Sequence, residues 1–136
     1  MTEPFRHTFR VRYAEIDGQS VVFNSRYLEY ADVLITEYWR ATGIHQTDIG
    51  ELEFHVVRAE VDYRAPIRYD ELIEGRVWTE RVGSTSIVTR FELHGASGQG
   101  GDDLRAEMKL VNVHVDLERG TPMPIPQEVR ARLGAG

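Results

Sequence analysis

One segment with helical periodicity stands among segments with strand periodicity, and this arrangement limits the folds open to the chain. Between Ser25 and Thr42, apolar residues recur every three or four positions, and Gly43 follows as a typical helix stop. The pattern predicts one long helix. Its apolar residues occupy most of the circumference, so we expect a sheet to wrap around it and bury it.

The segments on either side of this helix alternate between apolar and polar residues, which predicts strands with one buried face. One strand is expected at 5–13, followed by a loop at 14–20, where the alternation stops and Asp17-Gly18 supplies turn chemistry. Further strands are expected after the helix at 53–63, 72–81, 85–94 and 104–117.

Short connections indicate that the later strands pair antiparallel. Gly83-Ser84 predicts a tight hairpin, and the glycine-rich stretch 95–103 predicts a longer one. The sequence therefore predicts an α+β fold, with a five-stranded antiparallel sheet wrapped around one long central helix in a single domain, 1–136. Such a sheet leaves an edge exposed, so we expect a second copy to cover it.

The last strand and the C-terminal segment carry two further signals. The apolar parity of the strand changes from Leu110 to Val111, which predicts a β-bulge at 110–112. After several prolines, one or two helical turns are expected at 126–133, with proline at an early position.

Charge and composition exclude several classes of protein. The net charge of −6 opposes general binding to nucleic acid, because phosphate contacts draw on clustered Lys and Arg. The absence of cysteine excludes disulfides, thiolate metal sites and a cysteine nucleophile. No stretch approaches the ~20 apolar residues that a membrane-spanning helix needs. We therefore expect a cytoplasmic protein without membrane insertion.

Motifs for other chemistries are missing from the sequence. The five histidines show no spacing typical of metal ligands. The sequence contains neither a glycine-rich phosphate loop nor a Gly-x-Ser-x-Gly elbow. A metal site is therefore not expected, and neither nucleotide hydrolysis nor α/β-hydrolase chemistry has motif support.

Two blocks of residues resemble the signatures of one enzyme family. The first block is 11–30, in which Asp17 is followed by three residues, then two apolar residues, and later a tyrosine that opens the helix. The second block is 56–72, with a hairpin at 81–86. Together they resemble hotdog-fold thioesterases of the 4-hydroxybenzoyl-CoA thioesterase type over most of the chain. The resemblance implies a hotdog fold, a homodimer or tetramer, and an acyl-CoA or acyl-carrier-protein substrate, with no cofactor.

The resemblance assigns the central catalytic role to Asp17, as nucleophile or as general base for water. The oxyanion donors would be backbone amides near Asn24 and Ser25, because first-turn amides lack intrahelical partners and face the positive end of the helix dipole. On spacing alone, an Asp before Gly is more typical of a turn residue, and Asn24 is typical of an N-cap. With both blocks present, the catalytic interpretation of Asp17 is favoured.

Residues for substrate contact are expected on both sides of this centre. The competing interpretation is structural: aromatic residues on a buried helix usually belong to the hydrophobic core, and most of the arginines are ordinary surface charges. Glu15 could raise the pKa of Asp17 by like-charge repulsion, but a solvated carboxylate is the favoured interpretation. The residues expected to contact the acyl group are Val22, Phe23, Tyr27 and His55, with Tyr30 as a further candidate, and those expected to contact the CoA arm are Arg81 and Ser84.

The leading hypothesis is hydrolysis of an acyl-CoA thioester to the free acid and CoA. One alternative is an acyl-carrier-protein thioesterase of fatty-acid or polyketide synthesis, which the acidic net charge disfavours because such a carrier is itself acidic. Another is a non-catalytic acyl-CoA-binding hotdog protein. A hotdog dehydratase is disfavoured, because that class typically uses a histidine and none lies between Asp17 and Tyr27.

Overall fold

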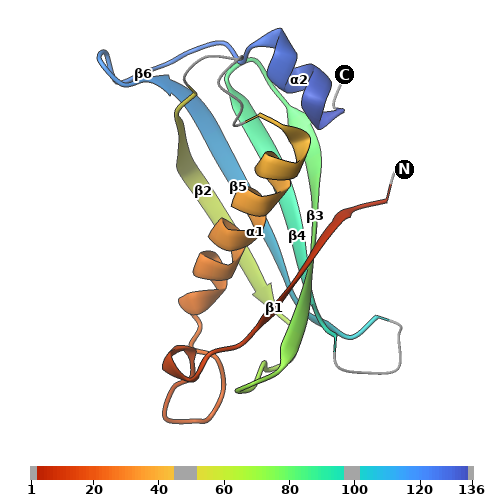
Figure 1. Ribbon diagram of the computed structural model, residues 1–136. Helices are drawn as coiled ribbons and strands as arrows, with labels where there is room; N and C mark the ends of the chain where they lie inside the picture. The colour runs from red at the N-terminus through yellow and green to blue at the C-terminus, as the bar shows by residue number, and fades with distance from the viewer. Residues whose placement is uncertain (1–2, 45–51, 97–101, 135–136) are drawn as a thin grey trace.

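The computed structural model describes residues 3–44, 52–96 and 102–134. The main strands form one antiparallel sheet in the order β1-β3-β4-β5-β2, with the short β6 beside β5. Figure 1 shows α1 lying across one face of this sheet and α2 at one end of it. The predicted α+β architecture is confirmed. The elements are β1 (Phe5–Arg10), the 3-10 turn η1 (Tyr13–Glu15), α1 (Arg26–Thr42), β2 (Phe54–Tyr63), β3 (Leu72–Val82), β4 (Ser86–Gly95), β5 (Leu104–Asp116), β6 (Thr121–Pro122) and α2 (Gln127–Leu133).

Helix α1 packs on the middle of the sheet through a close contact with β3. The side chain of Leu34 is fully buried, and it lies directly over Gly75. A Cβ at position 75 would overlap the Leu34 side chain, so only glycine lets the helix approach this closely.

The expected burial of α1 around most of its circumference is wrong. Leu28 and Val33 are 41% and 45% exposed, because the sheet covers only one side of the helix. The predicted stop is confirmed, since Gly43 takes the left-handed conformation with φ 80°. The buried residues of α1 are Tyr27, Tyr30, Ala31, Leu34, Ile35, Tyr38 and Trp39.

The first strand ends at Arg10 rather than at the expected position 13. The backbone amide of Arg12 donates a hydrogen bond of 2.8 Å to the Glu15 carboxylate, and this local contact folds the chain into η1. Tyr13 is consequently 73% exposed and packs edge-on against Tyr69, with ring centroids 5.6 Å apart. The alternating pattern predicted a strand as far as position 13, but the contact between Arg12 and the Glu15 side chain ends β1 earlier.

The expected bulge at 110–112 lies in the neighbouring strand instead. The register between β2 and β5 shifts between Val56 and Arg58, opposite Asn112 and Val111. The extra residue, Val57, is therefore on β2, and β5 keeps its even-numbered residues on the buried face. The predicted parity change in β5 was wrong because the buried face includes the polar residues Asn112 and His114.

The hairpins and the C-terminal helix follow the sequence-based predictions. Strands β3 and β4 are joined by a short turn closed by a 2.7 Å hydrogen bond from the Gly83 amide to the Ser86 carbonyl. The longer hairpin joins β4 to β5, although part of its predicted stretch, 97–101, lies outside the described residues. Helix α2 begins after Pro126 and ends at Gly134. In the described parts of the chain, no helix combines the length and apolar character needed to cross a membrane.

Candidate active site

Asp17 lies in a tight turn between η1 and the start of α1. Its backbone amide donates to the Val21 carbonyl at 2.8 Å, and its carbonyl accepts from the Ser20 amide at 3.0 Å. Ser20 takes a left-handed conformation with φ 65°. An isolated bridge between Ile16 and Val22 closes the turn, and a second bridge between Val21 and Arg68 connects it to the segment that precedes β3.

The Asp17 carboxylate has one occupied oxygen and one open oxygen. Oδ1 accepts a 2.8 Å hydrogen bond from the Gln19 amide, which is the turn contact that an Asp before Gly favours. Oδ2 accepts no hydrogen bond from any residue that the structure describes. The side chain is half-buried. The turn role and a chemical role are therefore compatible, because the first contact orients the group and leaves the second oxygen open to water or to a carbonyl carbon.

The start of α1 offers backbone donors close in sequence to this turn. Ser25 is the N-cap residue, and no side chain caps the helix, so the N-cap expected at Asn24 is wrong by one residue. The amides of Asn24 and Ser25 donate to no partner within the described ranges, and both residues are exposed. Unpartnered amides at the positive end of a helix suit a developing negative charge.

Contacts from neighbouring elements hold the start of α1 in place. The Tyr63 hydroxyl at the end of β2 donates a 2.8 Å hydrogen bond to the Asn24 carbonyl. The Phe23 amide donates to the Glu15 carbonyl at 3.0 Å. No local sequence pattern points to Tyr63 as a site residue, because its contact with Asn24 joins segments far apart in the chain.

The residues expected to contact the acyl group near this centre differ in how accessible they are. Phe23 is 46% exposed, so its ring is available beside the helix start. Val22 and Tyr27 are 4% and 3% exposed and belong to the hydrophobic core. The Tyr27 ring packs edge-on against Tyr63, with centroids 4.8 Å apart. Tyr27 thus supports the site from within the core.

The other expected substrate contacts lie at the opposite end of the sheet in the same chain. His55 is the second residue of β2, whereas Tyr63 ends the strand beside Asn24, a separation on the order of 25 Å at ~3.3 Å per strand residue. Arg81 and Ser84 lie at the β3–β4 hairpin, near α2 (Figure 1). All three are exposed. A single chain does not bring them to Asp17.

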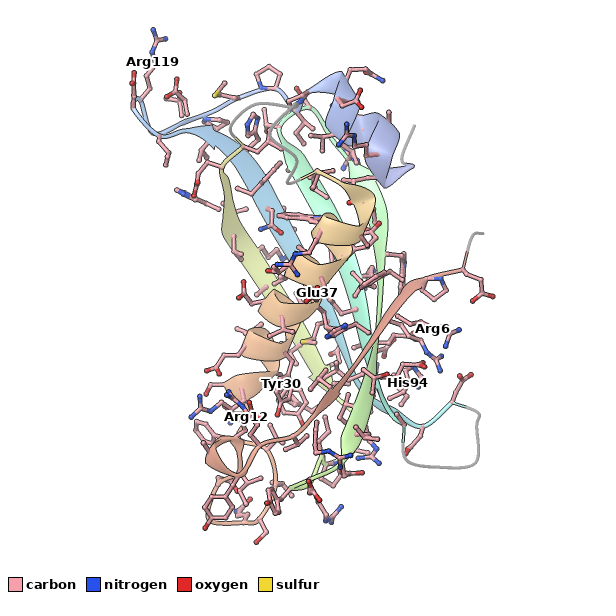
Figure 2. All side chains as sticks on the ribbon, viewed as in Figure 1. Arg6, Arg12, Tyr30, Glu37, His94 and Arg119 are labelled. Atoms are coloured by element: carbon pink, nitrogen blue, oxygen red, sulfur yellow. The ribbon has the colours of Figure 1, made fainter. Side chains whose placement is uncertain are left out.

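Glu15 is buried, so the expectation of a solvated carboxylate is wrong. The residue is 5% exposed, and its carboxylate accepts hydrogen bonds from the Arg12 amide at 2.8 Å, Arg12 Nε at 2.9 Å and the Tyr30 hydroxyl at 2.9 Å. Burial by itself raises the pKa of Glu15, but these donors outweigh it and hold the pKa below its usual value. Figure 2 shows Arg12 and Tyr30 near the start of α1.

Within residues 3–44, 52–96 and 102–134, no three His, Cys, Asp or Glu side chains gather into a group that could hold a metal ion. One of the five histidines, His45, lies outside these ranges. The chemistry available at the candidate site is that of a carboxylate and backbone amides.

The sequence of this chain is similar to those of proteins in one family. Residues 11–133 match the model of a family described as the Thioesterase-like superfamily. The chain is 28% identical over 131 residues to the Acyl-CoA thioesterase YbgC of Haemophilus influenzae, which covers 93% of this chain and 92% of the relative. It is 26% identical over 134 residues to the Acyl-CoA thioester hydrolase YbgC of Escherichia coli O157:H7, with 97% of each chain covered.

A solved structure with a similar fold is that of a 1,4-dihydroxy-2-naphthoyl-CoA thioesterase from Synechocystis. The TM-score is 0.83 at 17% sequence identity, with 96% of this chain and 95% of that chain covered. At this identity the similarity concerns the fold alone. The hotdog thioesterase fold expected from the sequence is thereby confirmed.

Proposed function

This chain belongs to the thioesterase-like superfamily, and on that basis we propose that it hydrolyses an acyl-CoA thioester to the free acid and CoA. One observation carries the proposal. A carboxylate oxygen of Asp17 and the amides of Asn24 and Ser25 lack partners among the described residues, and hydrogen bonds join the two segments that carry them. Relatives named as thioester hydrolases support hydrolase activity.

The proposed mechanism uses these groups in complementary roles. Asp17 either removes a proton from water as it attacks the thioester carbonyl, or attacks the carbonyl itself and forms an anhydride that water then hydrolyses. In both routes the carbonyl oxygen gains negative charge, which the amides of Asn24 and Ser25 stabilise. The C–S bond then breaks, and CoA leaves as its thiol after taking up a proton. Neither route needs a cofactor.

The first test is a panel of short, long and aromatic acyl-CoA thioesters, compared with the same acyl groups on an acyl carrier protein. We expect a larger kcat/KM for the CoA thioesters, because the net charge of −6 repels an acidic carrier. A thiol-reactive dye measures thiol release. Higher kcat/KM on the carrier would favour the alternative of a carrier-protein thioesterase, and acyl-CoA binding without turnover would favour a non-catalytic protein.

We also propose that the working enzyme is at least a homodimer that pairs through β2. This strand lies at an edge of the sheet, and its Val56 and Val57 are 54% and 62% exposed. Exposed apolar residues on an open edge favour pairing with another strand. In a two-fold arrangement the paired strands run antiparallel, so the partner's end of β2 that starts at Phe54 would lie beside the Tyr63 end of the first copy.

This arrangement would resolve the separation of the expected substrate contacts. The end of the sheet that carries His55, Arg81 and Ser84 in one copy would face the Asp17 end of the other copy. The acyl site and the CoA-binding residues would then come from different subunits. A tetramer of two such dimers is compatible with the same pairing.

Val57→Lys is expected to weaken the dimer at least ~10-fold, which corresponds to about 1.4 kcal/mol, because a charge would replace an apolar residue in the proposed contact. Sedimentation velocity over a range of protein concentrations measures the dissociation constant. Leu117→Lys is the matched control, since Leu117 is 68% exposed but lies outside β2. A wild-type protein that is monomeric and fully active at the concentration of the assay would contradict the proposal.

A further inference from the structure

The buried carboxylate of Glu15 connects the Asp17 turn with helix α1. Glu15 precedes Asp17 by two positions, and Oε1 accepts a 2.9 Å hydrogen bond from the Tyr30 hydroxyl. Tyr30 is 3% exposed and lies on α1 shortly after the unpartnered amides of Asn24 and Ser25. The hydrogen bond therefore spans the two halves of the proposed catalytic site.

The backbone of Glu15 makes a second connection to the same helix start. Its carbonyl accepts the Phe23 amide at 3.0 Å, and Phe23 directly precedes Asn24. On the other side, Ile16 forms an isolated bridge with Val22. One residue thus contacts the helix through its side chain and the segment before the helix through its main chain.

A buried charge is costly, and Glu15 remains charged because it has enough donors. Arg12 supplies its backbone amide and its guanidinium, and the Arg12 side chain is 74% exposed. The Arg12 contacts lie within the turn itself and shape η1. Two side chains of α1 join this turn to the helix: the Tyr30 hydroxyl donates to Glu15, and Arg26 Nη2 donates to the Ala14 carbonyl at 3.3 Å. Of the two, Tyr30 is the buried one.

We propose that Glu15 and Tyr30 are positioning residues of the thioesterase site, whose hydrogen bond holds the Asp17 turn at a fixed place relative to the helix-start amides. This inference rests on the proposed function. Neither residue contacts the substrate. The hydrogen bond between Glu15 and Tyr30 matters because the Asp17 carboxylate and the oxyanion donors must act on the same carbonyl group of the substrate. A misplacement of about 1 Å costs on the order of 100-fold in rate.

The test is Tyr30→Phe, with Tyr38→Phe as the matched control. Both tyrosines are buried on α1, and the Tyr38 hydroxyl makes a 2.7 Å hydrogen bond with Thr79 Oγ1, away from the Asp17 turn. We expect similar decreases in Tm for the two variants. Tyr30→Phe alone is expected to lower kcat ~10- to 100-fold with little change in KM, since it disturbs the reacting geometry. Equal kcat values for Tyr30→Phe and Tyr38→Phe would overturn the inference.

Variants of Glu15 provide an independent readout. Glu15→Gln keeps the side-chain length and an oxygen that can accept from Tyr30, so it should retain more activity than Glu15→Ala. Because Glu15 acts by position, the apparent pKa values in the pH profile of kcat/KM should remain those of the wild type in Glu15→Gln. A displaced profile would indicate an electrostatic role and contradict the inference. If Tyr30→Phe does not fold by circular dichroism, the Glu15 series decides.

The failure of this inference is distinguishable from the failure of the proposed function. Full activity of Asp17→Asn would refute the assigned chemistry. Loss of activity in Asp17→Asn, together with wild-type kcat in Tyr30→Phe and Glu15→Gln, would refute only the positioning role.

Discussion

Asp17→Asn is expected to fold like the wild type and to lose at least ~100-fold in kcat on acyl-CoA substrates, the scale of a positioned acid–base group. The asparagine carbonyl can replace Oδ1 as acceptor for the Gln19 amide, so the turn should persist. The variant loses the negative charge that both proposed routes need. Measured kcat, thermal unfolding and circular dichroism together separate a chemical defect from a folding defect.

Asp116→Asn is the matched control for this variant. Asp116 Oδ1 accepts the Glu118 amide at 2.9 Å, which is the same local contact, and Asp116 is likewise half-buried. It lies at the end of β5, away from the start of α1 in its own chain, and it is not among the residues assigned to substrate contact. We expect wild-type kcat in Asp116→Asn. Unchanged hydrolysis by Asp17→Asn would remove Asp17 from the mechanism.

The largest effect on stability is expected at the contact between α1 and β3. Leu34→Ala should lower the free energy of unfolding by ~2–5 kcal/mol, because it leaves a cavity under the helix. Gly75→Ala should lower it by ~1–3 kcal/mol, because the added Cβ overlaps the Leu34 side chain. Denaturant unfolding at one fixed protein concentration measures both effects, which matters for a protein that is proposed to dimerise.

The two substitutions should compensate when they are combined. In Leu34→Ala/Gly75→Ala the new methyl group no longer meets the leucine, so the loss should be smaller than the sum of the single losses by ~0.5–3 kcal/mol. Gly18→Ala is the control, since no atom lies within 4 Å of a Cβ built there. Its effect should stay within ~0.5 kcal/mol. Additive losses in the double variant would show that Leu34 and Gly75 do not determine the helix–sheet distance.

The sequence by itself determined the order of the long elements, but not the short η1 and β6. The helix ends at Thr42 and stops at Gly43 as expected, and β2 to β5 lie close to their predicted ranges. These features depend on neighbours within about four positions, namely helical and strand periodicity and the special backbone of glycine and proline. The resemblance also placed Asp17 near the start of a helix, because Asp17 and the helix start lie in the same short segment of the chain.

Only the tertiary structure decided which residues meet across that segment. The burial of Glu15, its link to Tyr30 and the contact of Tyr63 with Asn24 join residues that no local pattern relates. The sequence predicted a bulge at this place in the ladder but put it in the wrong strand, since an extra residue is defined only by the register between two strands. Local periodicity reports which side of its own element a residue occupies. The packing of separate elements decides what lies on that side.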